Sequence, residues 1–141
     1  MILALTLVNV LLLVVISGFH FYWALGGTLG GNIVLPEISK GEKVFKPSKT
    51  ATFVVAVILL VVSILPLEII GLLTHLSSGF LFDYGLLILG SIFCLRGVGD
   101  FKYVGLFKRV KETKFAYYDT RYFSPLAFLM GLIFFVIDYL N

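Results

Sequence analysis

Four long stretches of the chain are almost free of charged residues. They cover residues 2–23, 50–73, 82–98 and 122–140. A helix needs about 20 mainly apolar residues to cross the hydrocarbon layer of a bilayer, and the first two stretches are long enough. The uncharged cores of the last two are shorter, so flanking aromatic and cationic side chains must complete the crossing, and a re-entrant segment is the alternative there. The pattern predicts a single domain, residues 1–141, that is an all-α integral membrane protein with a four-transmembrane-helix bundle.

The composition adds one point to this prediction, which is that lipid surrounds much of the protein surface. Apolar residues make up 60% of the chain and charged residues 13%, and the mean hydropathy is +1.06. A typical soluble domain is about half apolar and about one quarter charged, and a domain of this size still exposes roughly a third of its surface. The apolar residues must therefore face lipid, which excludes disorder and an ordinary soluble fold. A lone cysteine, Cys94, excludes a disulfide framework and a multi-cysteine zinc site.

The cations are distributed asymmetrically among the three predicted loops. All eleven Lys and Arg residues fall in or beside loops 24–49 and 99–121, whereas loop 74–81 has none. Because Lys and Arg in short loops are retained in the cytoplasm, we expect both long loops to be cytoplasmic and both termini extracytoplasmic. Anionic lipid headgroups are the expected partners of these cations, and nucleic acid is not expected. No cationic region precedes the first stretch, so we expect it to be retained rather than cleaved as a signal peptide.

Polar residues within the first stretch follow one side of the predicted helix. At about 100° per residue, the following side chains fall within roughly 120° of one another: Thr6, Asn9, Ser17, His20 and Trp23. Two interpretations are open. The stripe is either a seam that forms hydrogen bonds across the bundle, or the lining of a cavity that ends at His20.

Small residues and a proline mark structural positions in the middle of the chain. Gly90, Cys94 and Gly97 have the spacing of one helix face, which predicts close packing against another helix. Pro66 predicts either a helix cap or a kink in the second stretch, and Asp83 is placed to complement the helix dipole at the start of the third.

Ionisable and aromatic residues gather where the predicted spans border the two basic loops. This predicted rim site comprises His20, Trp23, Arg96, Asp100, Tyr103, Lys108, Asp119 and Tyr122. Anchoring to anionic lipid, salt bridges and an aromatic belt would explain such a mixture, and so would a ligand site. His20 and His75 belong at opposite membrane faces and do not form a metal pair, so neither a metal nor a cofactor is predicted.

Three separated blocks of residues resemble a small bacterial membrane family catalogued only as domain of unknown function 3995. The blocks are His20-x-x-Trp23-Ala24-x-Gly26-Gly27, Arg96-x-x-Gly99-Asp100-Phe101-x-Tyr103-x-Gly105-x-x-Lys108, and Thr113-x-Phe115-Ala116-x-x-Asp119 followed by Ser124-Pro125-Leu126. The resemblance implies a four-span protein of the bacterial cytoplasmic (inner) membrane and supplies no reaction, substrate or site. The family favours Tyr directly before Ser-Pro-Leu, where this chain has Phe123, so no role that needs a hydroxyl there is carried over.

Three functions compete on this sequence. The first is binding of an amphipathic ligand or lipid headgroup at the cytoplasmic rim, or a transport-related role, with Arg96 and Lys108 countering the ligand's charge and Trp23 and Tyr103 stacking at the interface. The second is a non-catalytic accessory subunit of a larger membrane complex, or a homo-oligomer. The third is a small membrane enzyme in which His20 or Asp100 acts as acid or base. The first is the prediction, and no catalytic residue is assigned.

Overall fold

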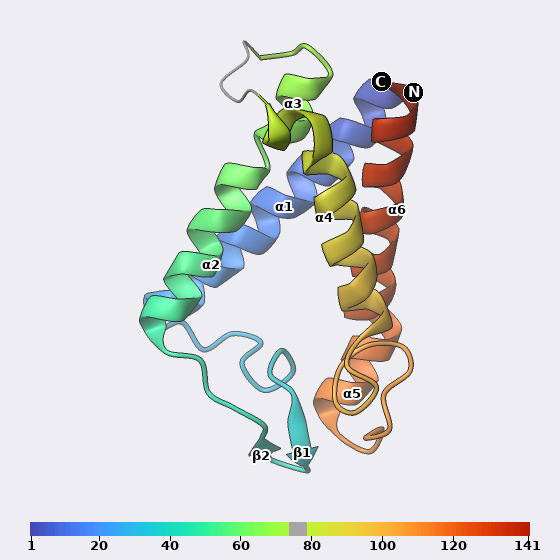
Figure 1. Ribbon diagram of the computed structural model, residues 1–141. Helices are drawn as coiled ribbons and strands as arrows, with labels where there is room; N and C mark the ends of the chain where they lie inside the picture. Colours follow the sequence, from blue (N-terminus) through green and yellow to red (C-terminus); the bar gives the residue numbers. More distant parts are fainter. Residues whose placement is uncertain (74–78) are drawn as a thin grey trace.

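The computed structural model describes residues 1–73 and 79–141 and is mainly helical (Figure 1). Its elements are, in order, α1 (Ile2–Ala24), β1 (Glu37–Ser39), β2 (Glu42–Lys43), α2 (Lys49–Val62), α3 (Leu65–Ile69), α4 (Phe80–Val98), α5 (Lys114–Tyr118), the π-helix η1 (Asp119–Phe123) and α6 (Ser124–Leu140). The two strands pair antiparallel as a short hairpin inside the first long loop.

Four helical stretches in the described part of the chain are long and apolar enough to cross a membrane. They are Ile2–Ala24, Lys49–Ile69, Phe80–Val98 and Lys114–Leu140. The third has 19 residues and the fourth 27. At 1.5 Å per residue, even the shorter one reaches about 28 Å, close to the thickness of the hydrocarbon layer. The expected helical fold with four spans is therefore confirmed at the level of helix length and composition.

Two predicted boundaries are wrong, and each has a local cause. The second span ends at Ile69 instead of residue 73 and is interrupted after Val62. Pro66, in the first turn of α3, provides no backbone N–H, and the Ser63 hydroxyl donates to the Leu60 carbonyl oxygen at 2.6 Å. Pro66 therefore stands at the start of a new helix, which is one of the two structural roles expected of it.

The fourth span starts at Lys114, within the region predicted as loop 99–121. The Thr113 hydroxyl accepts a hydrogen bond from the Ala116 N–H at 3.1 Å, which caps the first turn of α5. Asp119 made this region appear unsuited to a span, but its charge is paired inside the protein. Most of the predicted turn 74–81, including His75, lies outside the described residues.

The helices associate as two pairs. α1 packs along α2, α4 packs along α6, and α1 also contacts α6. The pairs meet near the end that carries both termini and diverge toward the end that carries β1, β2 and α5 (Figure 1). Both long loops thus lie at one end of the molecule and both termini at the other, as an even number of spans requires.

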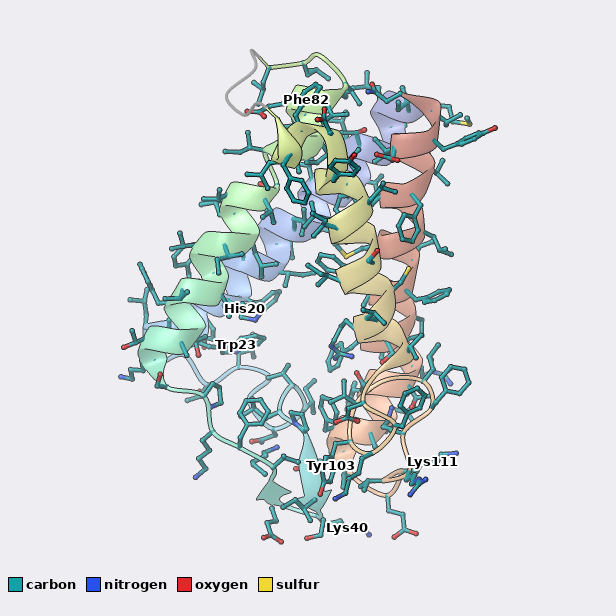
Figure 2. All side chains as sticks on the ribbon, in the orientation of Figure 1. His20, Trp23, Lys40, Phe82, Tyr103 and Lys111 are labelled. Carbon is teal, nitrogen blue, oxygen red and sulfur yellow. The ribbon has the colours of Figure 1, made fainter. Side chains whose placement is uncertain are left out.

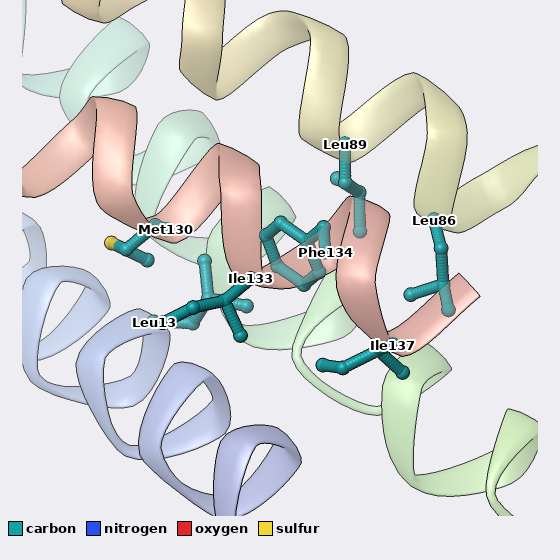
Figure 3. Packing of buried hydrophobic residues seen from close by; sticks show 7 residues of the cluster. All are labelled: Leu13, Leu86, Leu89, Met130, Ile133, Phe134 and Ile137. Atoms are coloured by element: carbon teal, nitrogen blue, oxygen red, sulfur yellow. The ribbon is translucent and has the colours of Figure 1, made fainter. Parts of the chain in front are cut away.

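Buried apolar side chains from α1, α4 and α6 form the core (Figure 3). Leu13 of α1 and Leu86 of α4 are fully buried, as is Phe134 of α6. In a membrane, lipid tails would be as apolar as these side chains, so close van der Waals contact and hydrogen bonds would have to hold the helices together.

The polar stripe of the first span lies on the buried side of α1. Asn9 donates its side-chain amide to the Met130 carbonyl oxygen at 3.0 Å, and the Ser17 hydroxyl donates to the Ala56 carbonyl oxygen at 2.7 Å. α1 is therefore joined by side-chain hydrogen bonds to both α6 and α2. For Asn9 and Ser17, the interpretation as a seam is confirmed.

Candidate functional site

A buried carboxylate organises the end of the molecule that carries the long loops. Asp119, the first residue of η1, is fully buried. Its Oδ1 accepts from Arg96 Nη2 at 2.9 Å, and its Oδ2 accepts from Lys108 Nζ at 2.9 Å and from the Gly105 N–H at 2.8 Å. A single side chain therefore ties the last turn of α4, the loop 99–113 and the start of the fourth span together. We call this set the Asp119 network, with members Arg96, Gly105, Lys108, Asp119, Thr120 and Ser124.

Lys108 uses all of its hydrogen-bond donors within the Asp119 network. Its side chain is 1% exposed. Besides Asp119, its ammonium donates to the Gly105 carbonyl oxygen at 2.7 Å and to the Thr120 hydroxyl at 2.6 Å. An ammonium group has three N–H donors, and here each has an acceptor. Lys108 thus has no donor left for a ligand.

Arg96 is the accessible cation of the network. Its side chain remains 38% exposed while Nη2 contacts Asp119, and Nη1 lies 3.4 Å from the Ser124 hydroxyl. A guanidinium carries five N–H donors, so Arg96 can contact a further acceptor without leaving Asp119. Arg96 and Lys108 share one carboxylate, so the ion-paired groups of the network carry one positive charge in excess.

The loop between α4 and α5 starts with a tight turn. Asp100 Oδ1 accepts from the N–H groups of Lys102, Tyr103 and Val104 at 2.9, 2.7 and 2.9 Å. Gly99 has φ +90°, which ends α4, and a Cβ on this residue would overlap the Val104 carbonyl oxygen. Partial burial raises the pKa of Asp100, but the backbone N–H groups outweigh it and hold the pKa below its ordinary value.

We expect this turn to lose order only in acid. Because the pKa of Asp100 is lower in the folded protein, its stabilisation is complete above the ordinary Asp pKa of about 3.9 and fades as the pH falls through the folded value. In an NMR titration, the amide shifts of Lys102, Tyr103 and Val104 should stay constant from neutral pH down to about 4 and move below it. Asp100→Asn keeps an acceptor and should abolish the titration. Asp100→Ala should speed amide exchange in the turn about tenfold, and unchanged exchange would contradict the role assigned to Asp100.

The structure separates the predicted rim residues into three groups. Arg96, Lys108 and Asp119 come together in the network. Asp100 and Tyr103 belong to the turn, where Lys102 Nζ lies 4.9 Å from the centre of the Tyr103 ring. Tyr122 is exposed, with its ring centre 6.1 Å from that of Tyr118.

His20 and Trp23 lie apart from the network, on α1 and in the other helix pair (Figure 2). Their ring centres are 5.3 Å apart, His20 Nδ1 lies 2.8 Å from the Ile16 carbonyl oxygen, and Trp23 Nε1 donates to the Leu29 carbonyl oxygen at 2.7 Å. Across residues 1–73 and 79–141, no three His, Cys, Asp or Glu side chains cluster closely enough to hold a metal ion.

Three members of the network were not predicted as site residues. Gly105 contributes only backbone atoms, and Ser124 and Thr120 contribute hydroxyl groups. Gly105 and Ser124 stand inside the blocks that carry the family resemblance, which was the available signal. Thr120 is marked by no feature of the sequence.

The helices and the Asp119 network together define a small helical protein with four helices able to span a membrane and a buried ionic network at one end. Over residues 13–134 the chain matches the family described as "Protein of unknown function (DUF3995)", and it belongs to that family. No curated protein and no solved structure matches the chain.

Proposed function

We propose that the protein is inserted in the bacterial cytoplasmic membrane and binds the anionic headgroup of a lipid or other amphipathic molecule at its loop-bearing end. In this proposal both long loops are cytoplasmic and both termini lie outside. All eleven Lys and Arg residues lie in or beside those loops, which supports this orientation by the positive-inside rule. Anionic headgroups are concentrated at that membrane surface, where they attract basic segments.

The observation that carries the proposal is the partly exposed side chain of Arg96, which is ion-paired with Asp119. It lies in the last turn of α4, where a span ends and headgroups begin. Asp119 fixes its position at 2.9 Å, and the network retains an excess positive charge. A guanidinium held in this way presents a planar pair of donors, which matches the oxygens of a phosphate group.

The other predicted rim residues take different roles in this proposal. Lys108 supports the site from inside, because all three of its donors are used within the protein. Asp100 shapes the turn that leads to Gly105, and Tyr122 is exposed and lies beside Tyr118. His20 and Trp23 are not part of it.

The test compares two arginines at the same end of the molecule. Arg96→Met and Arg121→Met remove the same charge, but Arg121 is exposed and belongs to no ion pair within the described residues. Native mass spectrometry of protein released from bilayers containing phosphatidylglycerol should show about tenfold lower lipid retention for Arg96→Met only. Arg96→Lys keeps the charge and should retain part of the binding.

Equal retention in both methionine variants would contradict the proposal and leave the cations as general surface anchors. A larger protein that copurifies stoichiometrically, with no retained lipid, would instead favour the accessory-subunit role. Thermal unfolding of each variant shows whether a loss of lipid reflects loss of the fold.

A further inference from the structure

A second polar feature lies farther along the loops, between the β1–β2 hairpin and the segment before α5. It is a hollow of about 780 Å³. Its walls come from two distant parts of the chain and comprise Ile38, Ser39, Lys40, Arg109, Val110, Lys111, Glu112 and Thr113. None of these residues belongs to the Asp119 network.

Both walls of the hollow are held in place by contacts behind them. On one side, Glu37 of β1 is 4% exposed and pairs with Lys43 of β2 at 2.9 Å. On the other side, the N–H groups of Arg109 and Val110 donate to the Lys102 carbonyl oxygen at 3.2 and 3.0 Å. β1 also contacts α5, which fixes the two walls relative to each other. The hollow therefore exists before any ligand binds.

The hollow concentrates positive charge. Lys40, Arg109 and Lys111 line it, against a single carboxylate from Glu112. All three cations are exposed, and none forms an ion pair with any residue in 1–73 or 79–141. Three cations around one hollow with a single carboxylate leave an excess of positive charge there, and a bound anion reduces the repulsion between them.

We infer that this hollow between the β1–β2 hairpin and residues 109–113 binds a phosphate-bearing polar group. The three cations supply the charge, and the Arg109 guanidinium matches phosphate oxygens in pairs. The volume is in the range of small-molecule sites and exceeds the size of a phosphate group alone, so the hollow has room for further polar substituents, for which Glu112 offers an acceptor. A bound group would join the first loop to the third at the end where the two helix pairs diverge (Figure 1).

The same chemistry is available from two sources, a soluble phosphate ester and a phospholipid headgroup. The first experiment places the full chain in nanodiscs of zwitterionic lipid and measures binding of glycerol 3-phosphate, a soluble probe, by calorimetry at constant ionic strength. The second places the full chain in nanodiscs that contain phosphatidylglycerol and measures retention of that lipid by native mass spectrometry.

The key variant is Lys40→Gln/Arg109→Gln/Lys111→Gln. Its matched control, Lys46→Gln/Lys49→Gln/Arg121→Gln, removes three exposed charges that lie outside the hollow: Lys46 before α2, Lys49 at the start of α2, and Arg121 in η1. We expect at least tenfold weaker binding of the recognised probe in the first triple variant only. All six side chains are exposed, so both variants should fold with unchanged melting temperatures.

If glycerol 3-phosphate binds and the first triple variant weakens this binding, the ligand is a soluble phosphate ester. If the first triple variant loses only phosphatidylglycerol retention, the ligand is a phospholipid headgroup. Either result supports the site. Absence of binding by both probes, or equal losses in the two triple variants, overturns it. The glycerol 3-phosphate measurement is independent of the headgroup site proposed at Arg96, because no residue that lines the hollow belongs to the Asp119 network. In the lipid measurement, the two sites are separated by combining Arg96→Met with the first triple variant, which should lower phosphatidylglycerol retention further than either variant alone.

Discussion

Replacing Asp119 by Asn is expected to lower the free energy of unfolding by about 3–5 kcal/mol, the cost of breaking a buried ion pair from one side. The substitution leaves Lys108, 1% exposed, without its counter-charge. It also directs a neutral amide toward two cations and toward the Gly105 N–H. The loop 99–113 is anchored through these contacts, so we expect it to loosen as well. Chemical denaturation in detergent measures the loss of stability, and amide exchange reports on the loop.

Two further variants make this result specific. Asp138→Asn changes a carboxylate near the far end of α6 that forms no ion pair among the described residues, and its effect should stay within about 0.5 kcal/mol. Lys108→Met/Asp119→Leu removes both buried charges and should cost less than Asp119→Asn alone, because Arg96 can turn toward water. If Asp119→Asn were as stable as the Asp138 control, Asp119 would not be the anchor of this end.

The positions of the spans were predictable because a helix must have about 20 mainly apolar residues to cross the hydrocarbon layer. The start of the fourth span was not, since hydropathy treats Asp119 and its flanking cations as loop residues. In the folded protein that carboxylate is neutralised by Arg96 and Lys108, which lie far from it in sequence. A charge that is paired only through tertiary structure cannot be recognised as buried from a local pattern.

The pairing of Arg96 shows the same limit at a single residue. The i, i+4 spacing of Arg96 and Asp100 would favour an ion pair between them if the helix continued through Gly99. The helix ends at Val98 because Gly99 adopts a positive φ, and Asp100 then accepts hydrogen bonds from its own turn. Arg96 instead pairs with Asp119, because the end of α4 at Val98 removes Asp100 from the helix.

The contact between α4 and α6 was predicted from one side only. Gly90, Cys94 and Gly97 gave α4 a small face, and the structure confirms that this face packs closely against another helix. The position opposite it is Gly131 of α6, where the backbones of the two helices approach most directly. Ala127 and Gly131 have the same spacing of small residues on one helix face, so this half of the contact also carried a signal in the sequence, which was missed.

Gly131→Ala is therefore expected to destabilise the protein by about 1–3 kcal/mol, the usual cost of overpacking. A methyl group at this position would lie 2.7 Å from both the Gly90 carbonyl oxygen and the Cys94 N, and 2.5 Å from Cys94 Sγ. Backbone atoms cannot move aside as a flexible side chain can, so α4 and α6 must separate. Gly131→Val should cost more, because it forces a wider separation along the same contact. Thermal unfolding in one detergent compares the variants.

Gly18→Ala is the matched control for this substitution, because it adds the same methyl group inside another span. Nothing lies within 4 Å of a Cβ at Gly18. Alanine also favours a helix over glycine by about 1 kcal/mol, so this variant should be as stable as the parent or more stable. A comparable loss in both variants would mean that glycine matters here for the helix backbone itself. A loss confined to Gly131→Ala identifies the α4–α6 approach as the contact that holds the second helix pair together in a lipid environment, where burial of apolar surface drives little association.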